Sequence, residues 1–377
     1  MARFIHTGDW QLGMTRHYFT DGAQERFSQA RFDAIARIGE LAREHAAEFV
    51  VVCGDVFETN QVDRRTVSRA LDGLARVPVP VYLLPGNHDP LDAGSLYRQP
   101  TFTQRKPSNV RVLETSEPLE VAPGVELVGA PWTSKRPLED LVARATRGLE
   151  PRPGRLRIVV AHGALDALSP NPDDPALIEL ASFERALAER RAHYLALGDR
   201  HSLTSVGSTG RVRYAGAPEP TDFDEVEPGH VLLVELDDAR CQVEPLRVAT
   251  WGFERREFRL DGDADLDAFA RTLEENPNKA RTVLKLDLIG TLTIRQKARL
   301  DQALEDLEDK YAAVPLSERR TELAVTPNDA DFAELALSGF GAAAVARLRE
   351  QAATTDELGR TARAALALLV RLSERRA

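Results

Sequence analysis

Short apolar runs alternate with longer amphipathic segments over the first third of the chain. Runs typical of β-strands occupy residues 3–7, 49–53 and 79–84. Between them, residues 24–46 and 66–75 carry apolar positions at three- and four-residue spacing, which predicts helices. This β-α-β-α-β order is typical of a sheet that is covered by helices on both faces.

Strand signals continue beyond residue 100, but few helices separate them. Further strands are predicted at residues 110–113, 125–130, 156–161, 194–197, 212–215 and 230–236. Parallel neighbours need long, usually helical connections. We therefore expect a mixed sheet, or two packed sheets, in place of one purely parallel sheet.

The pattern changes near Trp251, where a compact segment begins that we interpret as a second, α+β domain. Its strands and helices are predicted at residues 254–260, 264–275, 282–288, 294–311 and 321–325. After Pro327 the sequence is rich in Ala, Leu and Arg, and it predicts helices at residues 330–337, 342–351 and 355–373. The expected organisation is a first domain over residues 1–250, an α+β domain over 251–326 and a helical tail over 327–377.

Composition limits the functional classes only in part. No run of eighteen apolar residues offers a membrane span, and the first residues lack the pattern of a secretory signal. Two cysteines, Cys53 and Cys241, cannot build a disulfide framework, which favours a reducing, cytoplasmic location. The net charge of −10 counts modestly against tight DNA binding by this chain alone but does not exclude it, because a local basic face is enough to bind DNA.

Five short motifs each follow a predicted strand, where the loops of an open α/β sheet gather around ligands. They are Gly8-Asp9-Trp10-Gln11-Leu12-Gly13, Gly54-Asp55-Val56-Phe57-Glu58, Gly86-Asn87-His88-Asp89, Ala161-His162-Gly163 and Gly198-Asp199-Arg200-His201. Asp, Asn and His are ligands for divalent ions such as manganese, magnesium, iron or zinc. Any one pair such as Gly-Asp is common, but five motifs in this order predict a site for two metal ions that polarise a phosphate.

The order of these motifs resembles the calcineurin-like metallophosphoesterases. The opening Asp-Trp-x-Leu-Gly, the spacing and the appended α+β segment are similar to SbcD-type DNA repair exonucleases, the nuclease subunits of complexes that process double-strand breaks. The resemblance implies an α/β fold with a four-layer α-β-β-α core of mixed sheets, a smaller α+β capping domain that contacts DNA, and a helical C-terminal tail.

The resemblance also implies roles for individual residues. One metal would be held by Asp9, Asp55, His201 and Gln11. Asp55 would bridge to a second metal, whose other ligands are Asn87, His162 and Asp199. His88 would be catalytic, facing the substrate to stabilise the transition state and protonate the leaving oxygen.

Two of these positions depart from the common family pattern. Histidine is usual where Gln11 and Asp199 stand. Both substitutes can offer an oxygen ligand, so the cluster could stay intact with an altered metal preference. Oxygen-rich coordination favours Mn²⁺, with Mg²⁺ as the alternative.

The function implied is metal-dependent hydrolysis of DNA, as a 3′ to 5′ exonuclease and as an endonuclease on single strands. The implied partners are DNA and an SbcC-like ATPase with a coiled coil, and a homodimer is compatible with the resemblance. Two alternatives stay open: the same chemistry on a small nucleotide, and a DNA-binding scaffold that has lost a metal.

Two further segments allow more than one interpretation. The aromatic and basic residues of the segment 97–106 suit contact with a DNA strand, although an ordinary polar loop fits equally well. The apolar positions of the tail suit docking on a partner's coiled coil or packing on the tail's own chain. Trp10 and Trp132 could line the cleft, but tryptophan is more often part of a core.

Overall fold

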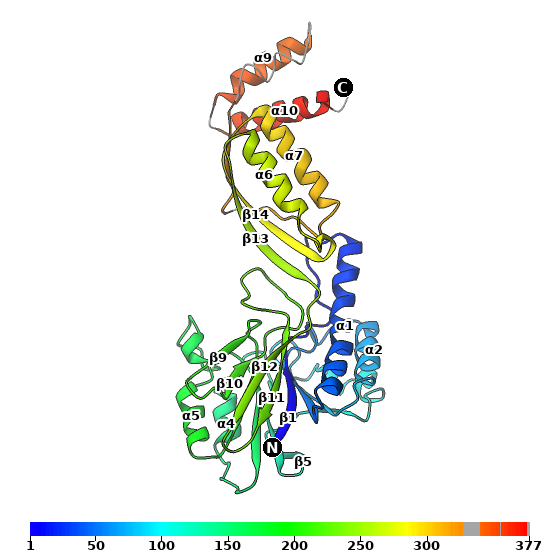
Figure 1. The fold of residues 1–377 in the computed structure, drawn as a ribbon, viewed down its shortest axis with the longest axis vertical. Coiled ribbons are helices and arrows are strands. Elements are labelled where there is room, and N and C mark those ends of the chain that lie inside the picture. The colour runs from blue at the N-terminus through cyan, green and yellow to red at the C-terminus, as the bar shows by residue number, and fades with distance from the viewer. Residues whose placement is uncertain (318, 327–339, 355, 375–377) are drawn as a thin grey trace. The chain divides into compact units, whose positions relative to one another are not determined.

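A computed structural model describes residues 1–317, 319–326, 340–354 and 356–374. The chain divides into two compact units, the first made of residues 1–17 and 24–251 and the second of residues 18–23 and 252–377 (Figure 1). The helix predicted at residues 330–337 lies outside the described residues.

The first sheet of the first unit has six strands in the order β12-β11-β1-β2-β3-β4. Strands β1 to β4 are parallel, whereas β11 is antiparallel to both β1 and β12. The bounds are β1 Ala2–Thr7, β2 Phe49–Cys53, β3 Val81–Leu84, β4 Val110–Val112, β11 His230–Leu236 and β12 Cys241–Arg247.

The second sheet also has six strands, in the order β5-β6-β7-β8-β10-β9. Its four central strands are parallel, and an antiparallel strand closes each edge. The bounds are β5 Leu119–Ala122, β6 Val125–Ala130, β7 Leu156–His162, β8 Tyr194–Gly198, β9 Thr204–Val206 and β10 Val212–Tyr214. Both sheets are therefore mixed, as the sequence predicts.

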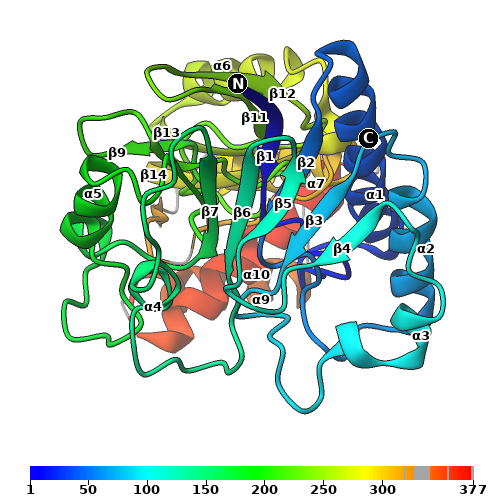
Figure 2. The ribbon, with the colours of Figure 1, turned by 90° about the horizontal axis from the view of Figure 1, so that it is seen from below.

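The two sheets pack against each other through one apolar core. Alternate residues of β1 show how this arises, because Phe4 faces the second sheet while Ile5 faces the helices. The helices on the first sheet are α1 (Asp21–Glu44), α2 (Arg64–Leu74) and α3 (Pro100–Thr103), and those on the second are α4 (Leu141–Thr146) and α5 (Leu180–Ala188). Figure 2 shows the resulting helix-sheet-sheet-helix order, which confirms the four-layer fold.

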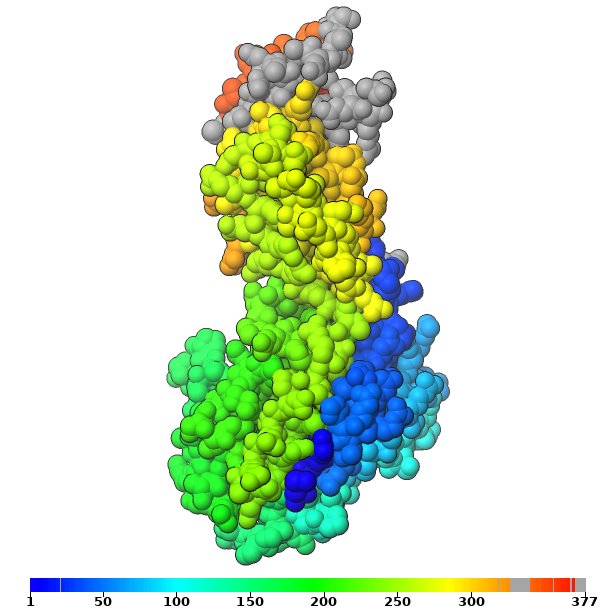
Figure 3. Space-filling model, viewed as in Figure 1, coloured from blue at the N-terminus to red at the C-terminus, as the bar shows by residue number. Residues whose placement is uncertain are grey.

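Several elements of this unit were not predicted from the sequence: β5, β9, β12, α3, α4 and α5. Strand β12 contains Pro245, which an edge strand tolerates because one side of its backbone needs no partner. This strand lies at the surface of the unit (Figure 3).

The second unit contains a parallel sheet in the order β13-β14-β15, with two helices between its strands. The bounds are β13 Gly252–Leu260, α6 Asp263–Glu274, β14 Thr282–Thr293, α7 Ile294–Glu308 and β15 Glu322–Thr326. Leu284, Leu286 and Leu288 of β14 pack against both helices. A capping box formed by Thr293 and Gln296 starts α7.

The described part of the tail consists of α9 (Phe340–Ala352) and α10 (Glu357–Glu374). Val345 of α9 and Leu366 of α10 are buried in a cluster with Ile294 and Ala298 of α7. The tail helices thus pack on their own chain over this cluster.

Candidate metal centre

The carboxyl ends of β1, β2, β3, β7 and β8 carry the polar residues that the five motifs predict. These strands belong to both sheets, and their ends meet at one edge of the four-layer core. The residues brought to this edge are Asp9, Gln11, Asp55, Asn87, His88, His162, Asp199 and His201.

Three of these residues form the buried centre of the site. One ligand atom each from Asp9, Asp55 and His162 lies within 4.8 Å of the other two. Nε2 of His162 is 3.5 Å from Asp55 Oδ1, 3.7 Å from Asp199 Oδ1 and 2.6 Å from the side-chain amide of Asn87. One imidazole nitrogen thus faces three oxygen-bearing side chains.

The backbone fixes the orientation of His162. Its Nδ1 donates to the carbonyl oxygen of Cys53 at 2.8 Å, so Nε2 is the nitrogen left for the site. Trp132 Nε1 donates to the carbonyl oxygen of His162 at 2.6 Å. Burial alone would lower the pKa of His162, but the surrounding carboxylates of Asp55, Asp199 and Asp9 outweigh it and raise the pKa to about 9.

His201 approaches the same centre from the other side. Its Nε2 is 3.8 Å from Asp9 Oδ1 and 3.3 Å from Gln11 Nε2. Its Nδ1 is 2.6 Å from Thr221 Oγ1 and 3.1 Å from Glu225 Oε1. No sequence motif pointed to Thr221 or Glu225, because they lie about twenty residues beyond the last motif and no strand end marks them.

Gln11 and Asp9 show that the centre suits a cation. The side chain of Gln11 is buried, and its Oε1 has no hydrogen-bond partner, so this oxygen is free to bind a metal ion. Burial raises the pKa of Asp9 to about 6, with His201 and His162 opposing the shift and Asp55 and Asp199 adding to it. Buried carboxylates that repel one another are stabilised by a divalent cation, so the donor set fits the predicted metals.

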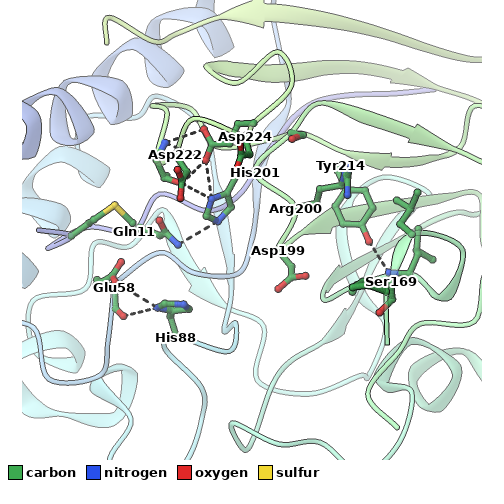
Figure 4. A pocket seen from close by; sticks show the side chains of 18 of the residues that line it. Gln11, Glu58, His88, Ser169, Asp199, Arg200, His201, Tyr214, Asp222 and Asp224 are labelled. Carbon is green, nitrogen blue, oxygen red and sulfur yellow. Dashed lines mark hydrogen bonds and ion pairs between the residues drawn. The ribbon is translucent and has the colours of Figure 1, made fainter. Parts of the chain in front are cut away.

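His88 lies at the edge of this centre, on a cavity of ≈ 530 Å³ that Gln11, Asp199 and His201 also line (Figure 4). Its backbone N–H donates to Asp55 Oδ1 at 3.0 Å, and its Nδ1 donates to the carbonyl oxygen of Glu58 at 2.8 Å. The side chain is 39% exposed, and Nε2 is 4.0 Å from Asp55 Oδ2. His88 therefore lies beside the carboxylates with one nitrogen unused.

Residues 2–209 match the family model described as calcineurin-like phosphoesterase, which is more than half of the chain. The chain belongs to this family. Its membership makes the chain an enzyme of phosphoester hydrolysis and implies divalent metal ions at the edge where the five motifs meet.

Comparison with known proteins identifies more specific relatives. The chain is 26% identical to the SbcD subunit of the SbcCD nuclease of Escherichia coli K12 over 286 residues, which cover 65% of this chain and 68% of the relative. It is 27% identical to the SbcD subunit of the same nuclease in Rhodobacter capsulatus over 371 residues, covering 85% and 88%. The DNA double-strand break repair protein Mre11 of Methanococcus maripaludis is 31% identical over 90 residues, covering 23% of each chain. The chain is thus similar to SbcD-type nucleases over most of its length.

The backbone around the phosphoesterase site is strained. Asp9, Gln11, Asp55 and Asp199 have positive φ values of 53°, 44°, 51° and 94°. They are four of the seven non-glycine residues with a positive φ in the described part of the chain. Such values are uncommon for residues with a Cβ and cluster at functional sites. The strain therefore marks the same loops as the motifs do.

Glycine permits the close approach of two of these loops. A Cβ on Gly198 would lie 1.9 Å from the carbonyl oxygen of Cys53, the atom that orients His162. Only a glycine lets β8 come this near to β2 at the site.

Asp89, the last residue of the third motif, is not one of the clustered ligands. It is fully buried and accepts hydrogen bonds from the backbone of Gly86 and Phe57 and from the Tyr97 hydroxyl. Burial raises its pKa to about 6. Asp89 thus holds the loops after β2 and β3 together.

The interpretation of segment 97–106 as a stacking surface is not supported. Tyr97 and Phe102 are buried in the core, and Arg105 contacts Ser68 and Asp72 on α2. Trp10 and Trp132 are also buried. None of the helices in the described part of the chain has the length and apolar character that a bilayer span requires.

Proposed function

We propose that the chain is a two-metal DNA exonuclease that works in DNA repair. The observation that carries the proposal is the buried group of Asp9, Asp55 and His162, whose ligand atoms lie within 4.8 Å of one another in a phosphoesterase core. The names of its relatives, the SbcD subunit of the SbcCD nuclease and Mre11, support DNA as the substrate. A 3′ to 5′ direction and endonuclease activity on single strands belong to the same proposal.

The proposed ligands form two overlapping sets. The first set, Asp9, Gln11, Asp55 and His201, is supported by the 3.8 Å distance between Asp9 and His201 and by the free Oε1 of Gln11. The second set, Asp55, Asn87, His162 and Asp199, is supported by the two carboxylate oxygens and the Asn87 amide around His162 Nε2. Asp55 is shared, and its enclosed carboxylate suits a bridging role.

Divalent ions in these sets would polarise a phosphate oxygen and lower the pKa of the attacking water. The chain supplies mostly oxygen donors, since only His162 and His201 contribute nitrogen. This donor set favours Mn²⁺, with Mg²⁺ second, over zinc.

His88 is proposed to act on the substrate and not on the metals. Its Nδ1 is engaged with the Glu58 carbonyl, so Nε2 is the nitrogen that can donate to a phosphate oxygen or to the leaving oxygen. The exposure of the ring at the cavity supports this role.

The decisive experiment is a Mn²⁺-dependent digestion of end-labelled single- and double-stranded DNA, run beside cyclic nucleotides. We expect loss of mononucleotides from DNA ends and no turnover of the cyclic nucleotides. Preference for the cyclic nucleotides would reject DNA as the substrate, and absence of all hydrolysis with Mn²⁺ bound would favour a scaffold.

We also propose an SbcC-like ATPase as a partner of the tail, because relatives along this chain are named as part of the SbcCD nuclease. Leu358 on α10 is 54% exposed and available for docking. Leu358→Glu is expected to abolish co-purification with the ATPase and to leave hydrolysis of short single strands unchanged. Unaltered co-purification would place the docking surface elsewhere.

A further inference from the structure

Glu225 lines the cavity beside His201 but follows none of the five motifs. Its side chain is only 7% exposed. Both of its oxygens accept from the backbone N–H of Thr221, at 3.2 and 3.0 Å, and Oε1 also accepts from the Thr221 hydroxyl. A carboxylate so enclosed has a fixed position relative to the loop that carries it.

This carboxylate determines which nitrogen of His201 carries a proton. Because the Thr221 hydroxyl donates to Glu225, its oxygen is left to accept from His201 Nδ1 at 2.6 Å. Glu225 Oε1 accepts from the same Nδ1 at 3.1 Å. With Nδ1 protonated, Nε2 presents its lone pair toward Asp9 and Gln11.

The loop that carries Glu225 is itself anchored to the fold. Arg31 of α1 is buried and donates to the carbonyl oxygens of Glu219 and Pro220, just before Thr221. It also donates to the carbonyl oxygen of Trp10, next to Gln11. One buried guanidinium therefore joins the loop that holds His201 to the loop that carries Gln11.

We propose that Glu225 is a positioning residue that aims Nε2 of His201 at the metal site through Thr221. The proposal rests on the assignment of His201 as a metal ligand in the proposed function. Glu225 touches neither metal nor substrate in this role, and the loss of its acceptor would let the imidazole rotate or change tautomer. The metal on the His201 side would then bind more weakly, while the metal on the His162 side would not.

The test is a Mn²⁺ titration of the full-length chain. Calorimetry measures the affinities, and electron paramagnetic resonance distinguishes a coupled pair of Mn²⁺ ions from a single ion. Glu225→Ala is expected to weaken one of the two sites by about 10- to 100-fold, the usual effect of removing a group that orients a ligand. Glu225→Gln keeps an oxygen that accepts from Thr221, so it is expected to restore most of the affinity. If the alanine variant does not fold, Glu225→Met keeps the volume without the acceptor.

Glu227→Gln is the matched control, because it removes one negative charge from an exposed residue of the same loop that does not line the cavity. Its affinities should equal those of the wild type. The proposal is overturned by wild-type binding at both sites in Glu225→Ala, or by equal losses in Glu225→Ala and Glu227→Gln. Since no DNA is present, a wild type that binds two Mn²⁺ but does not cut DNA would reject the proposed substrate and leave this inference standing.

Discussion

His162 and His201 present the same atom, Nε2, to one group of carboxylates, but different parts of the protein hold them. The backbone carbonyl of Cys53 holds Nδ1 of His162, whose side chain is fully buried. Two side chains, those of Thr221 and Glu225, hold Nδ1 of His201, which is 23% exposed. One side of the centre is therefore built by the sheet, and the other by a loop.

This difference indicates which side of the metal centre is more sensitive to substitution of side chains. The Cys53 carbonyl is present whatever side chain stands at that position, so no substitution there removes the acceptor. The orientation of His201 depends on particular side chains, and its neighbour Gln11 stands where the family usually has histidine. We infer that the His162 side follows from the fold, whereas the His201 side follows from residues that a single mutation can alter.

The largest effect is expected where the two sides meet. Asp55→Asn replaces the shared carboxylate by a neutral amide, so both ions should bind poorly and hydrolysis should fall by more than about 1,000-fold, the upper end for one stabilising donor. The fold should persist, because an amide fills the same volume. Nuclease assays with Mn²⁺ titrations measure both, and loss of only one ion would mean that the two sides are independent.

The next effect separates catalysis from metal binding on either side. His88→Ala removes the imidazole that faces the cavity, and hydrolysis should fall by about 100-fold, as expected for an acid–base or charge-stabilising group. Both ions should remain, because His88 belongs to neither ligand set. If metal titration of the purified variant shows a lost ion, His88 is a ligand and our assignment is wrong.

A third substitution disturbs the backbone contact that supports His162. Gly198→Ala would place a Cβ 1.9 Å from the Cys53 carbonyl oxygen, so the two strand ends must separate. We expect a loss of about 1–3 kcal/mol in the free energy of unfolding, as for other overpacked sites, and weaker Mn²⁺ binding on the His162 side. Gly148→Ala is the control, since nothing lies within 4 Å of its added Cβ. If the two variants have the same free energy of unfolding in urea, the close contact between Gly198 and the Cys53 carbonyl does not contribute to stability.

The sequence predicts the His162 side better than the His201 side for a physical reason. Asp55, Asn87 and His162 directly follow apolar runs that the sequence predicts to be strands. The carboxyl ends of those strands meet at one edge of the core, so the sequence predicts that these residues lie together. Glu225 follows no strand end, and only the folded loop reveals its contact with His201. Likewise, edge strands such as β12 were missed because their polar, partly exposed positions carry little hydrophobic signal.

The sequence also could not predict the role of the segment around Tyr97. Aromatic residues beside Arg and Lys are compatible with a nucleic-acid surface and with a core that meets a polar rim. The structure shows the second arrangement, because the hydroxyl of Tyr97 donates to the buried Asp89. Composition alone could not distinguish a ring that stacks on a base from one that holds a loop.

The smallest effect is expected from restoring the usual family residue on the His201 side. Gln11 has a φ of 44°, a region that histidine tolerates better than most residues, so Gln11→His should not strain the backbone. It exchanges an amide oxygen for an imidazole nitrogen, which should raise affinity at this site by about tenfold, the lower end of what supporting groups change. Activity should then tolerate zinc or nickel better, because imidazole suits these metals. Gln29→His, on the exposed face of α1, adds a histidine outside the site and serves as the control. Equal Mn²⁺ affinities in wild type and Gln11→His would reject the prediction that the amide of Gln11 weakens metal binding on the His201 side.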